Sequence, residues 1–105
     1  MNNKEVIDRE NKYYETLKVS ERTKLNYYYG INSKYLREYL KENYHIDSIF
    51  ELTDLEKLWD IYTYINVHPK NVENHRWCSV PIMKYIRFLN HGDRYGRRID
   101  CQSYK

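Results

Sequence analysis

The side chains of this sequence with the clearest chemical potential are basic and aromatic, and many lie between Ser20 and Tyr44. The run LNYYYGINSKYLREYLKENY holds six tyrosines interspersed with lysine and arginine. Lys and Arg neutralise phosphates and release counterions, and a tyrosine hydroxyl donates to phosphate oxygen. This chemistry predicts contact with the backbone of double-stranded DNA. The candidate nucleic-acid-binding residues are Arg22, Lys24, Tyr28, Tyr29, Lys34, Arg37, Lys41, Arg76, Lys84 and Arg87, with Lys70 as a further cation.

The same side chains also have an ordinary structural explanation. Basic and acidic residues three or four positions apart form surface pairs on any solvated helix. Tyr27, Tyr28 and Tyr29 would point about 100° apart on a helix, so the three rings cannot share one buried face. We therefore expect at least one of these rings to be exposed. Beside Lys24 it would stack on a base, anchor a protein interface or cover the edge of the core.

Acidic residues define a second candidate surface. Residues 46–67 hold five acids and one lysine, whereas residues 20–45, 68–89 and 90–105 are each net positive. Such an acidic surface could meet the nucleic-acid channel of a nuclease. The alternative hypothesis is therefore a phage or mobile-element protein that binds and inhibits a host defence nuclease, such as a CRISPR effector. Its candidate interface residues are Asp47, Glu51, Asp54, Glu56 and Asp60.

Metal binding and catalysis find little support in the residue spacing. His75, Cys78, His91 and Cys101 are possible zinc ligands, but structural zinc sites use shorter, paired spacings. Cys78 near His75 lacks a recognisable orienting group or oxyanion site, and no Gly-rich phosphate loop is present. We expect no enzyme activity, metal or cofactor, and we expect Cys78 to be a small buried hydrophobe.

Composition bounds the class of protein. The chain has 105 residues and a formal net charge of +3, which fits one domain and does not dictate a partner. Its first twenty residues carry charges throughout and no apolar run, which predicts neither a secretory signal nor a membrane span. Two cysteines suit reduced thiols better than a disulfide framework. These features predict a cytoplasmic setting.

Hydrophobic periodicity predicts the helices that must position these side chains. Residues 3–18 form one helix, with Val6, Tyr13 and Leu17 on its buried face. A second helix is expected from an N-cap at Ser20 through to Tyr44, where apolar residues recur every four positions. Within it, Gly30 would mark a close helix crossing or a break, and Tyr27, Tyr35 and Tyr39 are expected to pack in the bundle.

Two further helices complete the predicted fold. Thr53 and Glu56 match a T-x-x-E capping box before a helix at 54–66, which His68-Pro69 would end. The last helix includes SVPIMKYIRFLN and is expected to stop at Gly92. Pro81 either lies in its first turn or kinks a helix that begins near Glu73.

The overall prediction is an all-α protein, a compact bundle of about four helices. It assigns residues 1–92 to a single helical domain and residues 93–105 to an extended basic tail.

The order of these segments resembles a known helical domain. The carrying residues are Ser20 and Thr23, Tyr27, the run from Ser48 to Leu55, and the closing run from Tyr85 to Leu89. They resemble the N-terminal helical domain that precedes many HNH-type and other restriction-like nucleases. That domain is in turn similar to the SAM-like core-binding domain of tyrosine recombinases. The resemblance implies a free-standing bundle that helps to hold duplex DNA.

Overall fold

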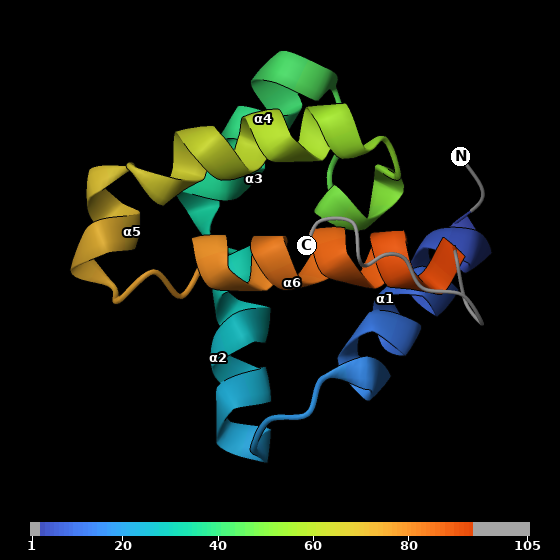
Figure 1. Ribbon diagram of the computed structural model, residues 1–105. Helices are drawn as coiled ribbons and strands as arrows, with labels where there is room; N and C mark the ends of the chain where they lie inside the picture. Colours follow the sequence, from blue (N-terminus) through green and yellow to red (C-terminus); the bar gives the residue numbers. More distant parts are fainter. Residues whose placement is uncertain (1–2, 94–105) are drawn as a thin grey trace.

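Helices make up all the regular structure of residues 3–93, the part of the chain that the computed structural model describes (Figure 1). The all-α prediction is confirmed. Over these residues there are six α-helices and one 3₁₀ helix, so the prediction of about four helices was too low. The elements are α1 (Asn3–Thr16), α2 (Glu21–Ile31), α3 (Lys34–Tyr44), the 3₁₀ helix η1 (Ile49–Glu51), α4 (Leu55–Asn66), α5 (Pro69–Glu73) and α6 (Ser79–Asp93).

Part of the difference in helix number comes from the predicted helix at 20–44, which is broken into α2 and α3. Gly30 lies against the segment that leads into α6, because a Cβ built on it would stand 1.8 Å from the Trp77 carbonyl oxygen. Ser33 then begins α3 as its N-cap residue, but its side chain makes no capping bond. The Ser33 hydroxyl instead donates to the Cys78 sulfur at 3.6 Å. Gly30 is therefore both a close crossing and a neighbour of the break.

The start of α4 agrees with the predicted position but uses a different cap. Asp54 is the N-cap residue, and its carboxylate accepts hydrogen bonds from the backbone N–H groups of Glu56 at 2.9 Å and Lys57 at 3.3 Å. The predicted capping box of Thr53 and Glu56 is wrong. The carboxylate of Asp54, one residue after Thr53, takes the capping role and accepts from the free N–H groups of the first turn.

Helix α6 lies at the centre of the fold and contacts α1, α2 and α4, as Figure 1 shows. Its inward side chains include Ile82 and Tyr85, which are fully buried. Tyr85 donates its hydroxyl to the Leu52 carbonyl at 2.7 Å, and Tyr13 from α1 donates to the Pro81 carbonyl at 2.7 Å. Tyr13 and Tyr85 are thus core residues whose hydroxyl groups are satisfied by backbone carbonyls.

The α5–α6 junction is held by the fully buried side chain of Asn71. Its amide oxygen accepts hydrogen bonds from the backbone N–H groups of Cys78 and Ser79, at 3.2 and 3.0 Å. The first turn of α6 is therefore capped from another helix. Pro81 lies in that first turn, where it interrupts no helical hydrogen bond.

Two other predictions concern the ends of the chain. Val6, Tyr13 and Leu17 are buried as expected.

Helix α6 continues through Gly92 to Asp93, so Gly92 does not stop it. The predicted tail at 93–105 lies outside the described residues from residue 94 onward. None of the described helices has the length and apolar character needed to cross a membrane.

Candidate nucleic-acid interface

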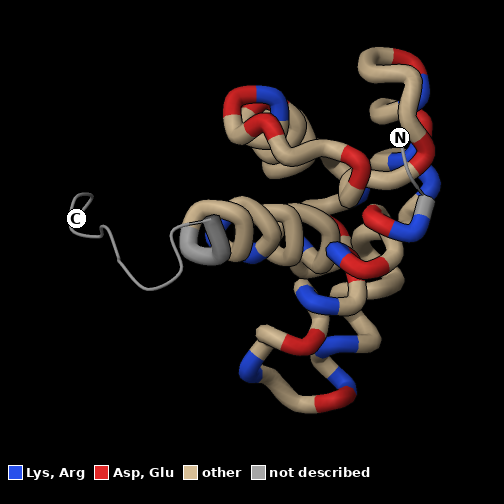
Figure 2. Tube along the Cα trace, turned by 90° about the vertical axis from the view of Figure 1, so that its right-hand side faces the viewer, with Lys and Arg blue, Asp and Glu red and all other residues tan. Residues whose placement is uncertain are grey.

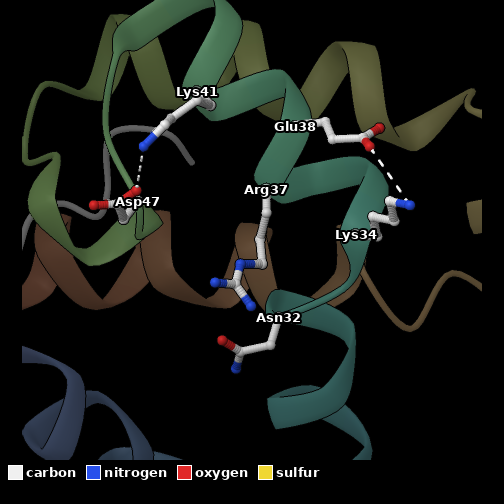
Figure 3. A pocket seen from close by; sticks show the side chains of 6 residues that line it. All are labelled: Asn32, Lys34, Arg37, Glu38, Lys41 and Asp47. Carbon is white, nitrogen blue, oxygen red and sulfur yellow. Dashed lines mark hydrogen bonds and ion pairs between the residues drawn. The ribbon is translucent and has the colours of Figure 1, made fainter.

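Helix α3 gathers three of the predicted basic residues on one side. Lys34, Arg37 and Lys41 are three and four positions apart, a spacing that places them on neighbouring turns of one helix face. Figure 3 shows them around an open depression of about 380 Å³, which Asn32 and two acidic residues also line. The depression is a surface on which a large anion could rest.

Two of the three cations are already paired. The Lys34 ammonium lies 4.0 Å from the Glu38 carboxylate, and the Lys41 ammonium lies 2.9 Å from the Asp47 carboxylate (Figure 3). The hydrogen bond and charge of Lys41, with a smaller contribution from Arg37, lower the pKa of Asp47 below its ordinary value. Among the described residues, no hydrogen bond or ion pair holds the Arg37 guanidinium. Arg37 is therefore the cation in this depression that has full donor capacity for a ligand.

A second open depression, of about 250 Å³, lies between α1 and α2. Its lining comprises Tyr14, Glu21, Lys24, Leu25 and Tyr28. The Lys24 ammonium is 3.8 Å from the Glu21 carboxylate, a long ion pair. The Tyr28 ring is 45% exposed, which confirms that at least one ring of the tyrosine triplet faces solvent.

One turn of α2 separates the two depressions. Lys24, Tyr28 and Asn32 follow at intervals of four residues and so lie along one side of α2. The Asn32 amide donates to the Tyr28 carbonyl at 2.8 Å, which joins a residue of each depression directly. Residues from α2 and α3 thus form one surface, which we call the α2–α3 face: Lys24, Leu25, Tyr28, Asn32, Lys34, Arg37 and Lys41.

The remaining predicted cations are not in either lining set. Arg22 is exposed on α2, Lys84 and Arg87 are on α6, and Lys70 is on α5. Arg76 has a structural role, because its guanidinium donates to the carbonyl and side-chain oxygens of Asn66 at 2.7 and 2.9 Å. Figure 2 shows Lys and Arg interspersed with Asp and Glu along the described helices. The cations outside the α2–α3 face thus line neither depression.

Most acidic residues of the alternative interface have partners within the fold. Glu51 accepts hydrogen bonds from the backbone N–H groups of Asp47 and Ser48, and completes a capping box at η1. Asp60 accepts from the hydroxyls of Tyr39 at 3.1 Å and Tyr44 at 2.6 Å. Asp54 caps α4 and Asp47 pairs with Lys41, as described above. The sequence held a signal for one of these roles, since Ser48 and Glu51 match the S-x-x-E pattern of a capping box.

A row of aromatic rings fixes α3 against α4. Tyr39 stacks on Tyr64 with ring centroids 4.0 Å apart, and Tyr35 stacks on His68 at 4.6 Å. The Tyr64 and His68 rings also meet, at 5.7 Å, which links the two stacks. Tyr35 and Tyr39 are partly buried against the core, whereas Tyr27 is buried in it. This row orients the opposite side of α3, with Arg37, toward solvent.

The metal and thiol candidates do not form a site among the described residues. No group of three or more His, Cys, Asp and Glu side chains there is placed to hold a metal ion. Cys78 is a buried free thiol, and burial raises its pKa to about 11. It is the small buried residue that the sequence predicted. The side chain of His91 and all of Cys101 lie outside the described residues.

Comparisons with protein-family models, with curated proteins and with solved structures give no match. The resemblance to core-binding domains therefore stays a prediction from the sequence pattern.

Proposed function

We propose that this protein is a small DNA-binding helical module that contacts the phosphate backbone of a duplex through its α2–α3 face. The observation that carries the proposal is the position of Arg37. Its unpaired guanidinium lies between Lys34 and Lys41 on the exposed side of α3. A planar guanidinium presents donors in a fork that matches two phosphate oxygens, and the flanking ammonium groups add attraction at longer range.

Neighbouring tyrosines extend the same chemistry. Tyr28 and Tyr29 are exposed on α2 and carry hydroxyl groups that can donate to phosphate oxygens. Glu21, Glu38 and Asp47 line the same two depressions and reduce the positive charge there, so the expected affinity is modest and strongly dependent on salt.

The alternative, inhibition of a host nuclease through the acidic residues, draws less support from the geometry. Glu51, Asp54 and Asp60 each accept two hydrogen bonds from within the fold. A partner would have to compete with those bonds. Within this acidic set, the Glu56 carboxylate makes no hydrogen bond or ion pair with a described residue. We therefore place duplex binding first.

Fluorescence anisotropy of a labelled duplex of about 20 base pairs, titrated with the protein at two salt concentrations, tests the proposal. Binding should weaken steeply as salt rises. The triple variant Lys34→Gln, Arg37→Gln and Lys41→Gln should bind more weakly and lower the salt slope by about 3, because each phosphate contact contributes about 0.9 to it.

Lys12, Lys57 and Lys70 offer a matched control, since these lysines are exposed on α1, α4 and α5. Their triple change to Gln removes the same formal charge from elsewhere on the surface. If both triple variants lose affinity equally, the attraction is diffuse and the α2–α3 face is not the binding site. Absence of binding at low salt would reject a DNA-binding function altogether.

A further inference from the structure

Tyr14 lines the depression between α1 and α2 and carries a polar group without a partner among the described residues. The Tyr14 hydroxyl oxygen is buried and makes no hydrogen bond to any described residue. Its neighbour Tyr13 differs, since that hydroxyl is bonded to the Pro81 carbonyl. Buried hydroxyls are normally hydrogen-bonded, so a ligand that shifts the Tyr14 ring and uncovers its hydroxyl would supply the missing bond.

Around Tyr14 the depression offers apolar and aromatic surface. Leu25 is 51% exposed and the Tyr28 ring is 45% exposed, both large fractions for such side chains. The Tyr14 and Tyr28 ring centroids are 6.4 Å apart and the rings are tilted by 52°, so the two rings are not stacked on each other. A flat ligand could therefore contact the Tyr28 face and the Leu25 methyl groups without breaking a stacked pair.

Charge completes the lining. The Lys24 ammonium stands at the same depression with only a 3.8 Å pair to Glu21. A flat ring with polar edges and an attached phosphate matches this set: the ring for Tyr28 and Leu25, an edge for the Tyr14 hydroxyl, and the phosphate for Lys24. A nucleotide whose base is unpaired has these parts, and bases stack on exposed aromatic side chains in single-strand-binding proteins.

Continuity with the phosphate-binding surface makes a nucleic acid the appropriate ligand. Tyr28 and Asn32 are one helical turn apart, about 6 Å along α2. A strand that leaves a duplex held by Arg37 could therefore reach the depression directly.

We infer that the depression of Tyr14, Glu21, Lys24, Leu25 and Tyr28 is a subsite for an unpaired nucleobase, so that the protein prefers duplexes with a single-stranded end. This inference rests on the proposed function. It adds a substrate class, a junction between duplex and single strand, to general backbone binding.

The test compares two labelled probes by fluorescence anisotropy: a blunt duplex, and the same duplex with a single-stranded overhang of about four nucleotides. The overhang should bind at least about fivefold more tightly than the blunt duplex. Tyr28→Ala removes a residue of the duplex-binding face as well as the stacking ring, so it should weaken binding of both probes and abolish the preference between them. Tyr14→Phe, which removes only the hydroxyl, should reduce the preference in part.

Tyr29→Ala is the matched control. Its ring is 62% exposed on the same helix but does not line the depression, so the preference should remain. Circular dichroism establishes whether each variant is folded. If Tyr28→Ala does not fold, Tyr14→Phe tests the subsite in its place.

The outcomes separate this inference from the proposed function. The nucleobase subsite is overturned if the two probes bind equally, or if the preference survives Tyr28→Ala. The proposed function still stands in that case when the triple variant of Lys34, Arg37 and Lys41 weakens blunt-duplex binding. Absence of binding to both probes at low salt overturns the subsite and the proposed function together.

Discussion

The side chain of Asn71 bonds to Ser79 in both directions. Its amide oxygen accepts from the Ser79 backbone N–H at 3.0 Å, and its amide nitrogen donates to the Ser79 hydroxyl at 2.9 Å. The same nitrogen is 3.3 Å from the Asn66 carbonyl oxygen. One buried amide thus joins the end of α4, the short helix α5 and the start of α6.

Replacing Asn71 with Ala should destabilise the protein by about 3 kcal/mol, since it removes a helix cap and leaves buried polar groups without partners. Urea unfolding followed by far-UV circular dichroism measures the loss. Asn11→Ala is the control, because Asn11 is exposed on α1 and the same exchange there should change stability by less than about 0.5 kcal/mol. Similar stabilities for the two variants would contradict the capping role of Asn71.

Gly30→Ala provides a test in which two effects have opposite signs. Helix propensity alone favours Ala over Gly by about 1 kcal/mol. The added Cβ would stand 1.8 Å from the Trp77 carbonyl oxygen, a backbone atom that cannot rotate away. We expect the clash to win, with a net loss of about 2 kcal/mol in the free energy of unfolding. A stabilised variant would show that α2 and the Trp77 segment do not touch.

Tyr13 and Tyr14 should differ in how the loss of the hydroxyl group changes stability. Tyr13→Phe removes the hydrogen bond to the Pro81 carbonyl and should cost about 1 kcal/mol. Tyr14→Phe removes a buried hydroxyl that has no described partner, so stability should be unchanged or increased. Thermal unfolding of the two variants side by side checks this. A clear loss in Tyr14→Phe would indicate that its hydroxyl is already satisfied in the free protein.

Alkaline pH should weaken the contact between α3 and α4. Burial, then the hydrogen bond to the Asp60 carboxylate, raises the pKa of Tyr44 from 10.0 to about 12. The neutral hydroxyl is the native form, so its contribution to stability is complete below pH 10 and is lost as the pH rises through 12. NMR titration of carbon-labelled tyrosine rings measures the pKa of Tyr44, which should fall in Asp60→Asn. An unchanged pKa in that variant would exclude Asp60 as a cause.

Within the proposed interface, Asp47 competes with phosphate for Lys41. Asp47→Asn should release the Lys41 ammonium and tighten duplex binding at low salt by about threefold, a size typical of an exposed ion pair. Asp8→Asn breaks a comparable exposed pair with Lys4 on α1 and should leave affinity unchanged. Anisotropy titrations compare the two variants. An equal gain in both would indicate that only total charge matters.

The fold was predictable where local sequence signals agree with tertiary packing. The N-cap at Ser20 is confirmed, since the Ser20 side chain accepts from the Thr23 N–H. Gly30 left two alternatives open, a close helix crossing or a break, and only its contact with Trp77, which is far away in the sequence, shows that the crossing accompanies the break. Thr53 and Asp54 are adjacent, and hydrophobic periodicity does not locate the start of a helix to a single residue, so it could not choose between them as the cap.

The candidate interface was predictable where it depends on spacing within one helix, and not where it depends on partners from other segments. Helical spacing alone places Lys34, Arg37 and Lys41 together. Sequence could not show that Arg76 is occupied by Asn66, or that Asp60 is bonded to two tyrosines, because those partners come from other segments. Charge counted along the chain therefore overstated both the basic and the acidic surfaces.

The contact between Gly30 and Trp77 has a consequence for how a ligand would be received. Backbone meets backbone there, with no side chain between that could change rotamer. Ser33 at the start of α3 bonds to Cys78 of the same segment, so the break between α2 and α3 is held from both sides before any partner arrives. Association with such a surface gives up little conformational entropy and should show only a small change in heat capacity, the calorimetric signature of a preorganised site.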